Sequence, residues 1–197
     1  TAVSVTRTIS DSGDNIETFI RNSNGNYWSV SEENIQAAID DLGSGSSLRN
    51  GIVTVPGDRS ITINNGIVLK KYITLDLQGS CLDVRSNVDA VMMAEGSTLC
   101  GGTIDTRNYG GIYTKAAVVF SPQDIGHTYW NGNTFVNDMY LLGKEGQGSG
   151  IELRCNNQGN VIAFTNCADM QIRGFNTSIL ISVMGGGATG AMTYANS

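Results

Sequence analysis

Residues 51–84 read GIVTVPGDRSITINNGIVLKKYITLDLQGSCLDV, and this stretch decides the fold class. It consists of short runs of β-branched and aliphatic residues, each three to five residues long, separated by Gly, Asn, Asp or Pro. Strands in an ordinary sandwich average about 5–6 residues. Runs this short favour a solenoid, in which each coil forms a few short strands and then turns a corner.

The same pattern continues to residue 181. The later runs are Val91–Met93, Thr103–Asp105, Ala117–Phe120, Met139–Leu142, Ile151–Leu153, Val161–Phe164, Met170–Ile172 and Ile179–Ile181. Three pairs of similar segments recur at a step of 28 or 29 residues: Leu75-Asp76 with Ile104-Asp105, Phe135–Asn137 with Phe164–Asn166, and Gly150–Leu153 with Ser178–Ile181. This period predicts coils that stack like residues, with Asp105 above Asp76 and Asn166 above Asn137.

One helix is predicted before the strands. Ser29 and Glu32 have the spacing of a capping box. An apolar stripe follows at i, i+3, i+4 and i+7, formed by Ile35, Ala38, Ile39 and Leu42, and Gly43 ends the pattern. Because a solenoid has open ends with unpaired strand edges, we expect this helix to lie across the first coil as a cap.

The chain divides into three parts. Residues 1–28 form an N-terminal lead-in or assembly segment, and residues 29–183 form the capping helix and the solenoid. Residues 184–197 are rich in Gly and small residues and lack strand character, which predicts a tail that pairs with another subunit or a linker.

Composition argues against several protein classes. The net charge is −6, only 15% of residues are charged, and the densest basic site is Lys70-Lys71. Nucleic-acid binding depends on phosphate neutralisation, so we do not expect a nucleic-acid partner. We do not expect membrane insertion either, because no apolar run approaches the ~20 residues of a spanning helix.

The four cysteines are Cys81, Cys100, Cys155 and Cys167. None belongs to a CxxC pair, so the sequence predicts no zinc site. Free buried thiols, one disulfide and two disulfides all remain open.

The stretch from Asn34 to Gly79 resembles the opening of the pectate-lyase-like, or pectin-lyase-fold, superfamily, in its branch of phage and archaeal-virus tailspikes. There a helix with an Ile-Gln-x-Ala-Ile pattern, here Ile35–Ile39, precedes a strand that ends in Pro-Gly, here Pro56-Gly57. Gly101–Asp105 also fits a later coil, and the resemblance covers residues 32–183. It implies an all-β fold: a right-handed single-stranded parallel β-helix with a short N-terminal capping α-helix. It further implies a homotrimer assembled side by side.

The resemblance does not carry over catalytic residues. The superfamily's galacturonan hydrolases carry Asp-Asp and Gly-His-Gly motifs, and the nearest echoes here, Asp40-Asp41 and Gly126-His127-Thr128, match in neither order nor context. A catalytic acid pair or a Ca²⁺ site needs carboxyl groups close together. The weak candidates are Asp76, Asp105, Asp124, Asp138 and Glu152. The alternative for all five is turn formation and solubility, so no catalytic residue and no cofactor is assigned.

A polar, aromatic loop is the better candidate for recognition. His127, Tyr129 and Trp130 are expected to be exposed, and with Tyr140 they form the predicted glycan-binding or interface set. Exposed Tyr and Trp rings stack on sugar rings or pack against a neighbouring subunit.

The leading hypothesis is a structural protein of a virion or cell surface, a tailspike, fibre or decoration subunit. It would assemble with itself and with other virion or surface proteins, and bind surface polysaccharide of the host. The absence of a matching catalytic motif makes an enzyme the second hypothesis, a polysaccharide lyase or glycoside hydrolase of the same fold. The third is an adhesin or extracellular filament subunit.

Overall fold

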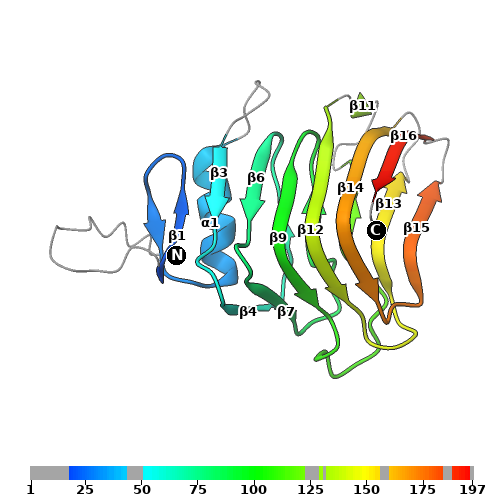
Figure 1. Ribbon diagram of the computed structural model, residues 1–197, viewed down its shortest axis with the longest axis horizontal. Helices are drawn as coiled ribbons and strands as arrows, with labels where there is room; N and C mark the ends of the chain where they lie inside the picture. The colour runs from blue at the N-terminus through cyan, green and yellow to red at the C-terminus, as the bar shows by residue number, and fades with distance from the viewer. Residues whose placement is uncertain are drawn as a thin grey trace, which may run out of the picture.

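The computed structural model describes residues 18–43, 51–122, 129–130, 132–155, 160–183 and 188–195, with no side chains for 129 and 188–195. Those residues form an all-β molecule with one short helix, as predicted. The strands lie side by side in chain order from one end of the molecule to the other (Figure 1). Every predicted strand from residue 51 to residue 183 is present.

The larger sheet holds most of the strands. Its main order is β2 (Tyr27–Trp28), β1 (Ile20–Asn22), β3 (Gly51–Thr54), β6 (Ile73–Asp76), β9 (Thr98–Asp105), β12 (Thr134–Leu142), β14 (Val161–Arg173) and β11 (Tyr129–Trp130). β16 (Ala188–Ala195) pairs with β14, and β4 (Ser60–Ile63) pairs with β7 (Cys81–Val84), which pairs with β9. Only the pairs of β1 with β2 and with β3 are antiparallel.

The smaller sheet is parallel throughout. Its order is β5 (Ile67–Val68), β8 (Val91–Met93), β10 (Ala116–Phe120), β13 (Ser149–Cys155) and β15 (Thr177–Val183). From β3 onward the chain passes back and forth between the two sheets, so the strands of each sheet are aligned on their predecessors. Parallel neighbours of this kind require a crossover through other structure between them.

Aligned apolar residues form continuous columns in the core. In the larger sheet the column is Val53, Leu75, Leu99, Val136 and Cys167. In the smaller sheet it is Ile67, Val91, Val118 and Ile151. All nine side chains are buried. No single layer of strands could bury these side chains alone, so the columns depend on their neighbours.

The predicted repeat is wrong at two of its three steps. Asp76 aligns with Cys100, and Asp105 aligns with Asp83. Phe135 aligns with Asn166, so the predicted stack of Asn137 and Asn166 does not form. The step from Ile151 to Ile179 is confirmed. The spacing of aligned residues varies because the connections differ in length, from the turn after β6 to the long segment between β10 and β12.

Left-handed residues mark a corner of the larger sheet. Gly101, Asp138 and Asp169 have φ of 72°, 52° and 53°, and the register places them side by side in β9, β12 and β14. At the same corner Gln78, with φ of 46°, lies between β6 and β7. A left-handed residue bends the strand and re-aims the side chains beyond it. Because Gly101, Asp138 and Asp169 align with one another, the register of β9, β12 and β14 is the same before and after the corner.

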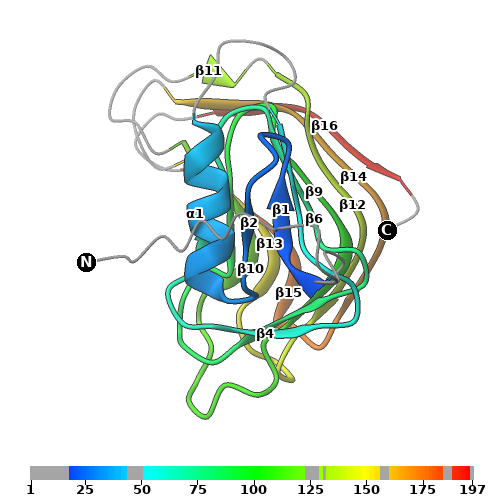
Figure 2. The ribbon, with the colours of Figure 1, turned by 90° about the vertical axis from the view of Figure 1, so that its left-hand side faces the viewer.

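The helix α1 (Glu32–Leu42) lies across the N-terminal end of the sheets (Figure 2). Its stripe of Ile35, Ala38 and Ile39 is buried against the first strands, as predicted. The N-cap is Ser31 rather than Ser29, and its hydroxyl accepts the N–H of Asn34 at 3.2 Å. The capping box was wrong because the helix begins two residues later.

Two side chains of α1 take the place of missing strand partners. The Glu32 carboxylate accepts the backbone N–H groups of Asn64, Asn65 and Gly66 at 3.0, 2.8 and 2.7 Å. The Gln36 amide bonds both backbone groups of Val68: it accepts from the N–H at 2.9 Å and donates to the carbonyl at 3.1 Å. The edge of β5 is therefore hydrogen-bonded although no strand lies beside it there.

The two flanking parts contain strands that the sequence did not indicate clearly. In the lead-in, β1 and β2 form a hairpin that joins β3, while residues 1–17 lie outside the described residues. In the predicted tail, residues 188–195 form β16, so the prediction that this part lacks strand character is wrong. Main-chain pairing with β14 stabilises a strand here despite its small residues.

Candidate functional site

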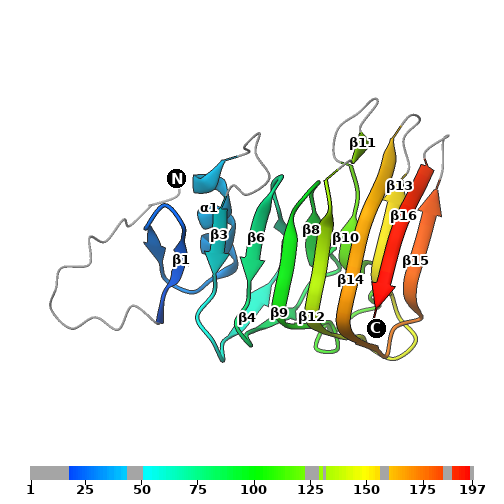
Figure 3. The same ribbon diagram turned by 45° about the horizontal axis from the view of Figure 1, so that its top comes forward.

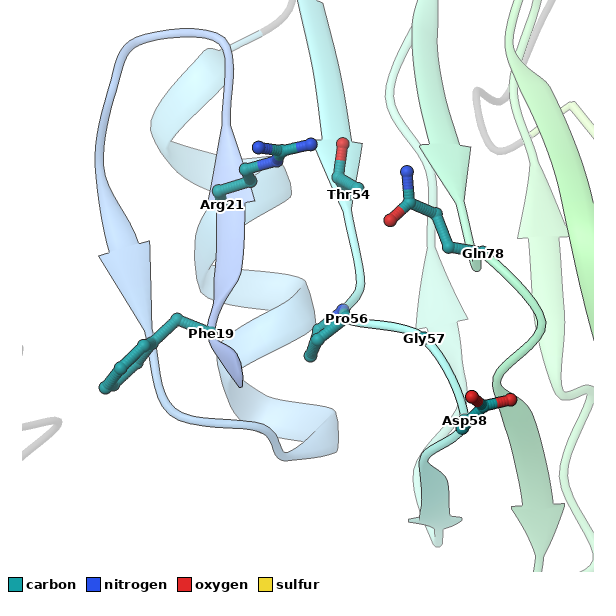
Figure 4. A pocket seen from close by; sticks show the side chains of 7 residues that line it. All are labelled: Phe19, Arg21, Thr54, Pro56, Gly57, Asp58 and Gln78. Atoms are coloured by element: carbon teal, nitrogen blue, oxygen red, sulfur yellow. The ribbon is translucent and has the colours of Figure 1, made fainter. Parts of the chain in front are cut away.

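A groove of about 350 Å³ opens between the β1–β2 hairpin and the turns that follow β3 and β6. Its lining residues are Phe19, Arg21, Thr54, Pro56, Gly57, Asp58 and Gln78. The Arg21 guanidinium, the Thr54 hydroxyl and the Gln78 amide point toward one another, and the Phe19 ring lies at the outer rim (Figure 4). The volume suits a small ligand or one unit of a larger one.

Arg21 differs from Arg85, Arg107 and Arg154 in having no carboxylate partner among the described residues. Among the described residues its guanidinium has no ion pair or hydrogen bond, and the Asp58 carboxylate has none either. By contrast, carboxylates hold Arg85, Arg107 and Arg154. The guanidinium can donate hydrogen bonds, and the amide and the hydroxyl can both donate and accept them, a combination that suits the vicinal hydroxyl groups of a sugar.

The groove has a rigid floor. The Ser80 hydroxyl donates to the carbonyl of Pro56 at 2.6 Å and accepts the backbone N–H of Arg59 at 3.0 Å. A Cβ atom on Gly57 would lie 2.9 Å from the carbonyl oxygen of Gln78, so the two turns pack directly on each other. Their geometry is set before any ligand binds, which lowers the ordering entropy that binding must overcome.

The outward face of the larger sheet continues from the groove with a row of uncharged side chains, one apolar and two polar. Ile52, Thr74 and Thr98 align there on β3, β6 and β9. Farther along, Tyr140 of β12 aligns with Thr103 and is 46% exposed. Tyr140, one of the predicted recognition residues, is thus available for stacking.

The candidate carboxylates do not form an acid–base pair. Asp76 caps its own turn and accepts the backbone N–H of Gln78 at 3.1 Å, and Asp138 is exposed at the corner of the sheet. Asp105 and Glu152 are buried, and each forms an ion pair with the arginine two residues later, Arg107 and Arg154. The fifth candidate, Asp124, lies outside the described residues.

One close pair of carboxylates was not predicted. Asp83 aligns with Asp105 on the neighbouring strand, and Arg85 donates to Asp83 at 2.7 Å. Burial alone would raise the pKa of Asp105, but the hydrogen bonds from Arg107 lower it overall. An ionised carboxylate cannot serve as the general acid that glycoside hydrolysis needs. The recurrence of Asp-x-Arg at 83–85 and 105–107 was the sequence signal for this pair.

Besides the pairs Asp83–Arg85 and Asp105–Arg107, an ion cluster joins β13 to the connection before β8. Arg154 bonds Glu152 and also reaches Asp89, 65 positions earlier in the chain, at 2.8 and 3.1 Å. Burial alone would raise the pKa of Asp89, but the hydrogen bonds from Arg154 and from the N–H of Ala116 outweigh it, so the pKa is lowered overall. The cluster is structural because every charge in it has a partner.

The cysteines are free thiols. Burial, followed by the nearby Asp105 and Asp83, raises the pKa of Cys81 to about 11. Burial likewise raises the pKa of Cys100 to about 11 and that of Cys167 to about 12. Reactive thiols have a lowered pKa, so these three are unsuited to nucleophilic catalysis.

The predicted recognition loop is corrected at Trp130. The Trp130 side chain is 2% exposed and packs at 6.3 Å between ring centroids against Phe120, so it cannot stack on a sugar. The strand β11 pairs with β14 and holds the backbone of Trp130 over the core. His127 and the side chain of Tyr129 lie outside the described residues.

In the described part of the chain, no group of three or more His, Cys, Asp or Glu side chains could hold a metal ion. In the same part of the chain, no helix is long and apolar enough to cross a membrane.

Comparison with known proteins adds no relative. No protein-family profile, no curated protein and no solved structure matches the chain.

Proposed function

We propose that the chain is a right-handed parallel β-helix with α1 as its N-terminal cap, and that it is a non-catalytic structural protein of a virion or cell surface. As a tailspike, fibre or decoration subunit it presents the groove and the adjoining sheet face to host glycans. The alternation of strands between two parallel sheets supports the solenoid. The resemblance of residues 32–183 to the tailspike-like superfamily supports the setting.

The groove carries the proposal. It brings an unpaired guanidinium, a hydroxyl and an amide together on a rigid floor, while ion pairs occupy the close carboxylates. That distribution suits binding without hydrolysis, because Asp58 is the only carboxylate among the lining residues, whereas glycoside hydrolysis needs two.

A glycan array followed by titration calorimetry tests the binding. Arg21→Ala is expected to weaken binding about 10-fold to 100-fold, the loss of one or two hydrogen bonds to a charged group. Arg59→Ala is the matched control, because Arg59 is exposed and lies outside the lining of the groove. Equal affinity of the two variants would remove the groove from the proposal.

The enzyme hypothesis is kept because Asp83 and Asp105 are adjacent. A polysaccharide-depolymerisation screen by reducing-end release decides it. If the wild type releases reducing ends and Asp105→Asn does not, the chain is a hydrolase or lyase rather than a structural protein.

Self-assembly belongs to the same proposal. A side-by-side homotrimer would have a mass of three times 20.9 kDa, or a multiple of that mass where trimers associate further. Light scattering on a size-exclusion column measures this mass, and a clean monomer would count against a trimeric spike.

A further inference from the structure

The C-terminal end of the molecule exposes two strand edges. β15 is the last strand of the smaller sheet, and β16 pairs with β14 alone (Figure 3). An edge strand presents a row of unpaired N–H and C=O groups, which is a template for another strand.

The same end exposes core-facing apolar side chains. Ile181 and Val183 are 47% and 43% exposed. They align with Leu153 and Cys155, which are completely buried inside the molecule. The apolar column therefore continues to the surface, where nothing in the described residues covers it.

Charge identifies the surface that can cover this end. Residues 160–183 and 188–195 contain one acidic residue, Asp169, and one basic residue, Arg173. The opposite end presents α1, which carries Glu32, Glu33, Asp40 and Asp41 and has no basic residue in its last turn. At that end Gln36 already hydrogen-bonds the backbone groups of Val68 at the edge of β5. Head-to-tail stacking would thus place an acidic, hydrogen-bonded surface on apolar side chains.

We propose that two copies of the chain pair through their C-terminal ends. A two-fold axis sets β15 antiparallel to β15 of the second copy, so that the free main-chain groups bond across the axis. The same contact buries Ile181 and Val183 of both copies. The inference concerns this end of the molecule and does not rest on glycan binding.

The test is the mass in solution of Ile181→Lys and Ile112→Lys, measured by light scattering. Ile112 is 73% exposed and lies in the connection between β9 and β10, so Ile112→Lys adds the same charge elsewhere. Ile181→Lys places two like charges on opposite sides of the two-fold axis between the copies. It is expected to halve the mass of the assembly in solution, whether or not copies also associate side by side. Ile112→Lys is expected to leave the mass unchanged.

Small-angle scattering gives the geometry. The maximum dimension of the wild type should be about twice that of Ile181→Lys, as for end-to-end pairing. A circular-dichroism spectrum and a thermal unfolding transition like those of the wild type would show that Ile181→Lys is folded. An odd number of copies in the wild type, an unchanged mass in Ile181→Lys, or open-ended growth from head-to-tail contacts would each overturn the proposal.

Discussion

At the N-terminal end of this molecule a helix and a hairpin cover the first strands, whereas at the C-terminal end no other described residues cover the edges of β15 and β16. The covering helix buries Ile35 and Ile39 and hydrogen-bonds the edge of β5 through Gln36. The uncovered end leaves Ile181 half-exposed in an otherwise buried column. Side chains of α1 cover the N-terminal end, and the exposed edge of β15 at the C-terminal end is suited to binding a second copy.

The largest expected effect comes from the same substitution made at both ends. Ile39→Ala leaves a cavity under α1 and should lower the free energy of unfolding by about 2–5 kcal/mol. Ile181→Ala removes an exposed side chain and should lower it by about 1 kcal/mol or less in the dilute protein. Urea denaturation followed by circular dichroism measures both values. Equal losses would mean that the C-terminal end is as well packed as the N-terminal end.

The next effect isolates the hydrogen bonds of the cap. Glu32→Gln keeps the shape of the side chain but replaces the carboxylate, whose two oxygens accept three backbone N–H groups, with a neutral amide that has one oxygen. This change should lower the free energy of unfolding by about 1–3 kcal/mol. Glu33→Gln, exposed on the same helix, is the control and should change stability little. Thermal unfolding of the two variants separates a role of Glu32 in the cap from a general effect of helix charge.

Acid should loosen the covered end first. Hydrogen bonds from Asn22 and Asn26 lower the pKa of Asp41, which ties the hairpin to α1. A lowered folded-state pKa means that this stabilisation is present above the unfolded value and is lost as the pH falls through the folded one, below about pH 4. The side-chain amide resonances of the two asparagines, followed by NMR during acidification, report the loss. Asp41→Asn should abolish this pH dependence, and simultaneous loss at both ends would contradict it.

The smallest effect concerns one amide proton. In Gln36→Ala the Val68 N–H loses its acceptor and should exchange with solvent about 10-fold faster, the equivalent of one hydrogen bond. In the Ile181→Lys background, the β15 amides that do not pair with β13 should already exchange fast. Slow exchange of those amides in that background would mean that something else covers the C-terminal edge.

Local patterns predicted the elements well. The apolar stripe of Ile35, Ala38 and Ile39 specified α1, because a 3.6-residue period has few alternative readings. The short β-branched runs specified the strands from residue 51 to residue 183. The strand at 188–195 was missed because its Gly and Ala residues carry little strand signal and separate the strand-favouring Thr and Tyr residues.

Register and burial were harder to predict from the sequence. A constant step could not anticipate the different lengths of the connections between aligned strands, which set the register. Trp130 was expected to be exposed because its neighbours are polar, but pairing of β11 with β14 places it over Phe120. Arg21 carried no local motif, and the groove forms only when the hairpin folds beside the turn at Gly57.

The ion pairs at the ends of β7 and β9 have a consequence for the evolution of such a chain. Asp83 with Arg85, and Asp105 with Arg107, balance their charges between residues two positions apart in sequence. A segment of this kind could be duplicated or deleted in a gene without leaving an unmatched buried charge elsewhere in the protein. Arg154 is different, because it also holds Asp89 on the connection before β8. Changes in length should therefore be tolerated more readily beside Asp83–Arg85 and Asp105–Arg107 than in the segments that adjoin Asp89 and Arg154, where they would move one partner away from the other.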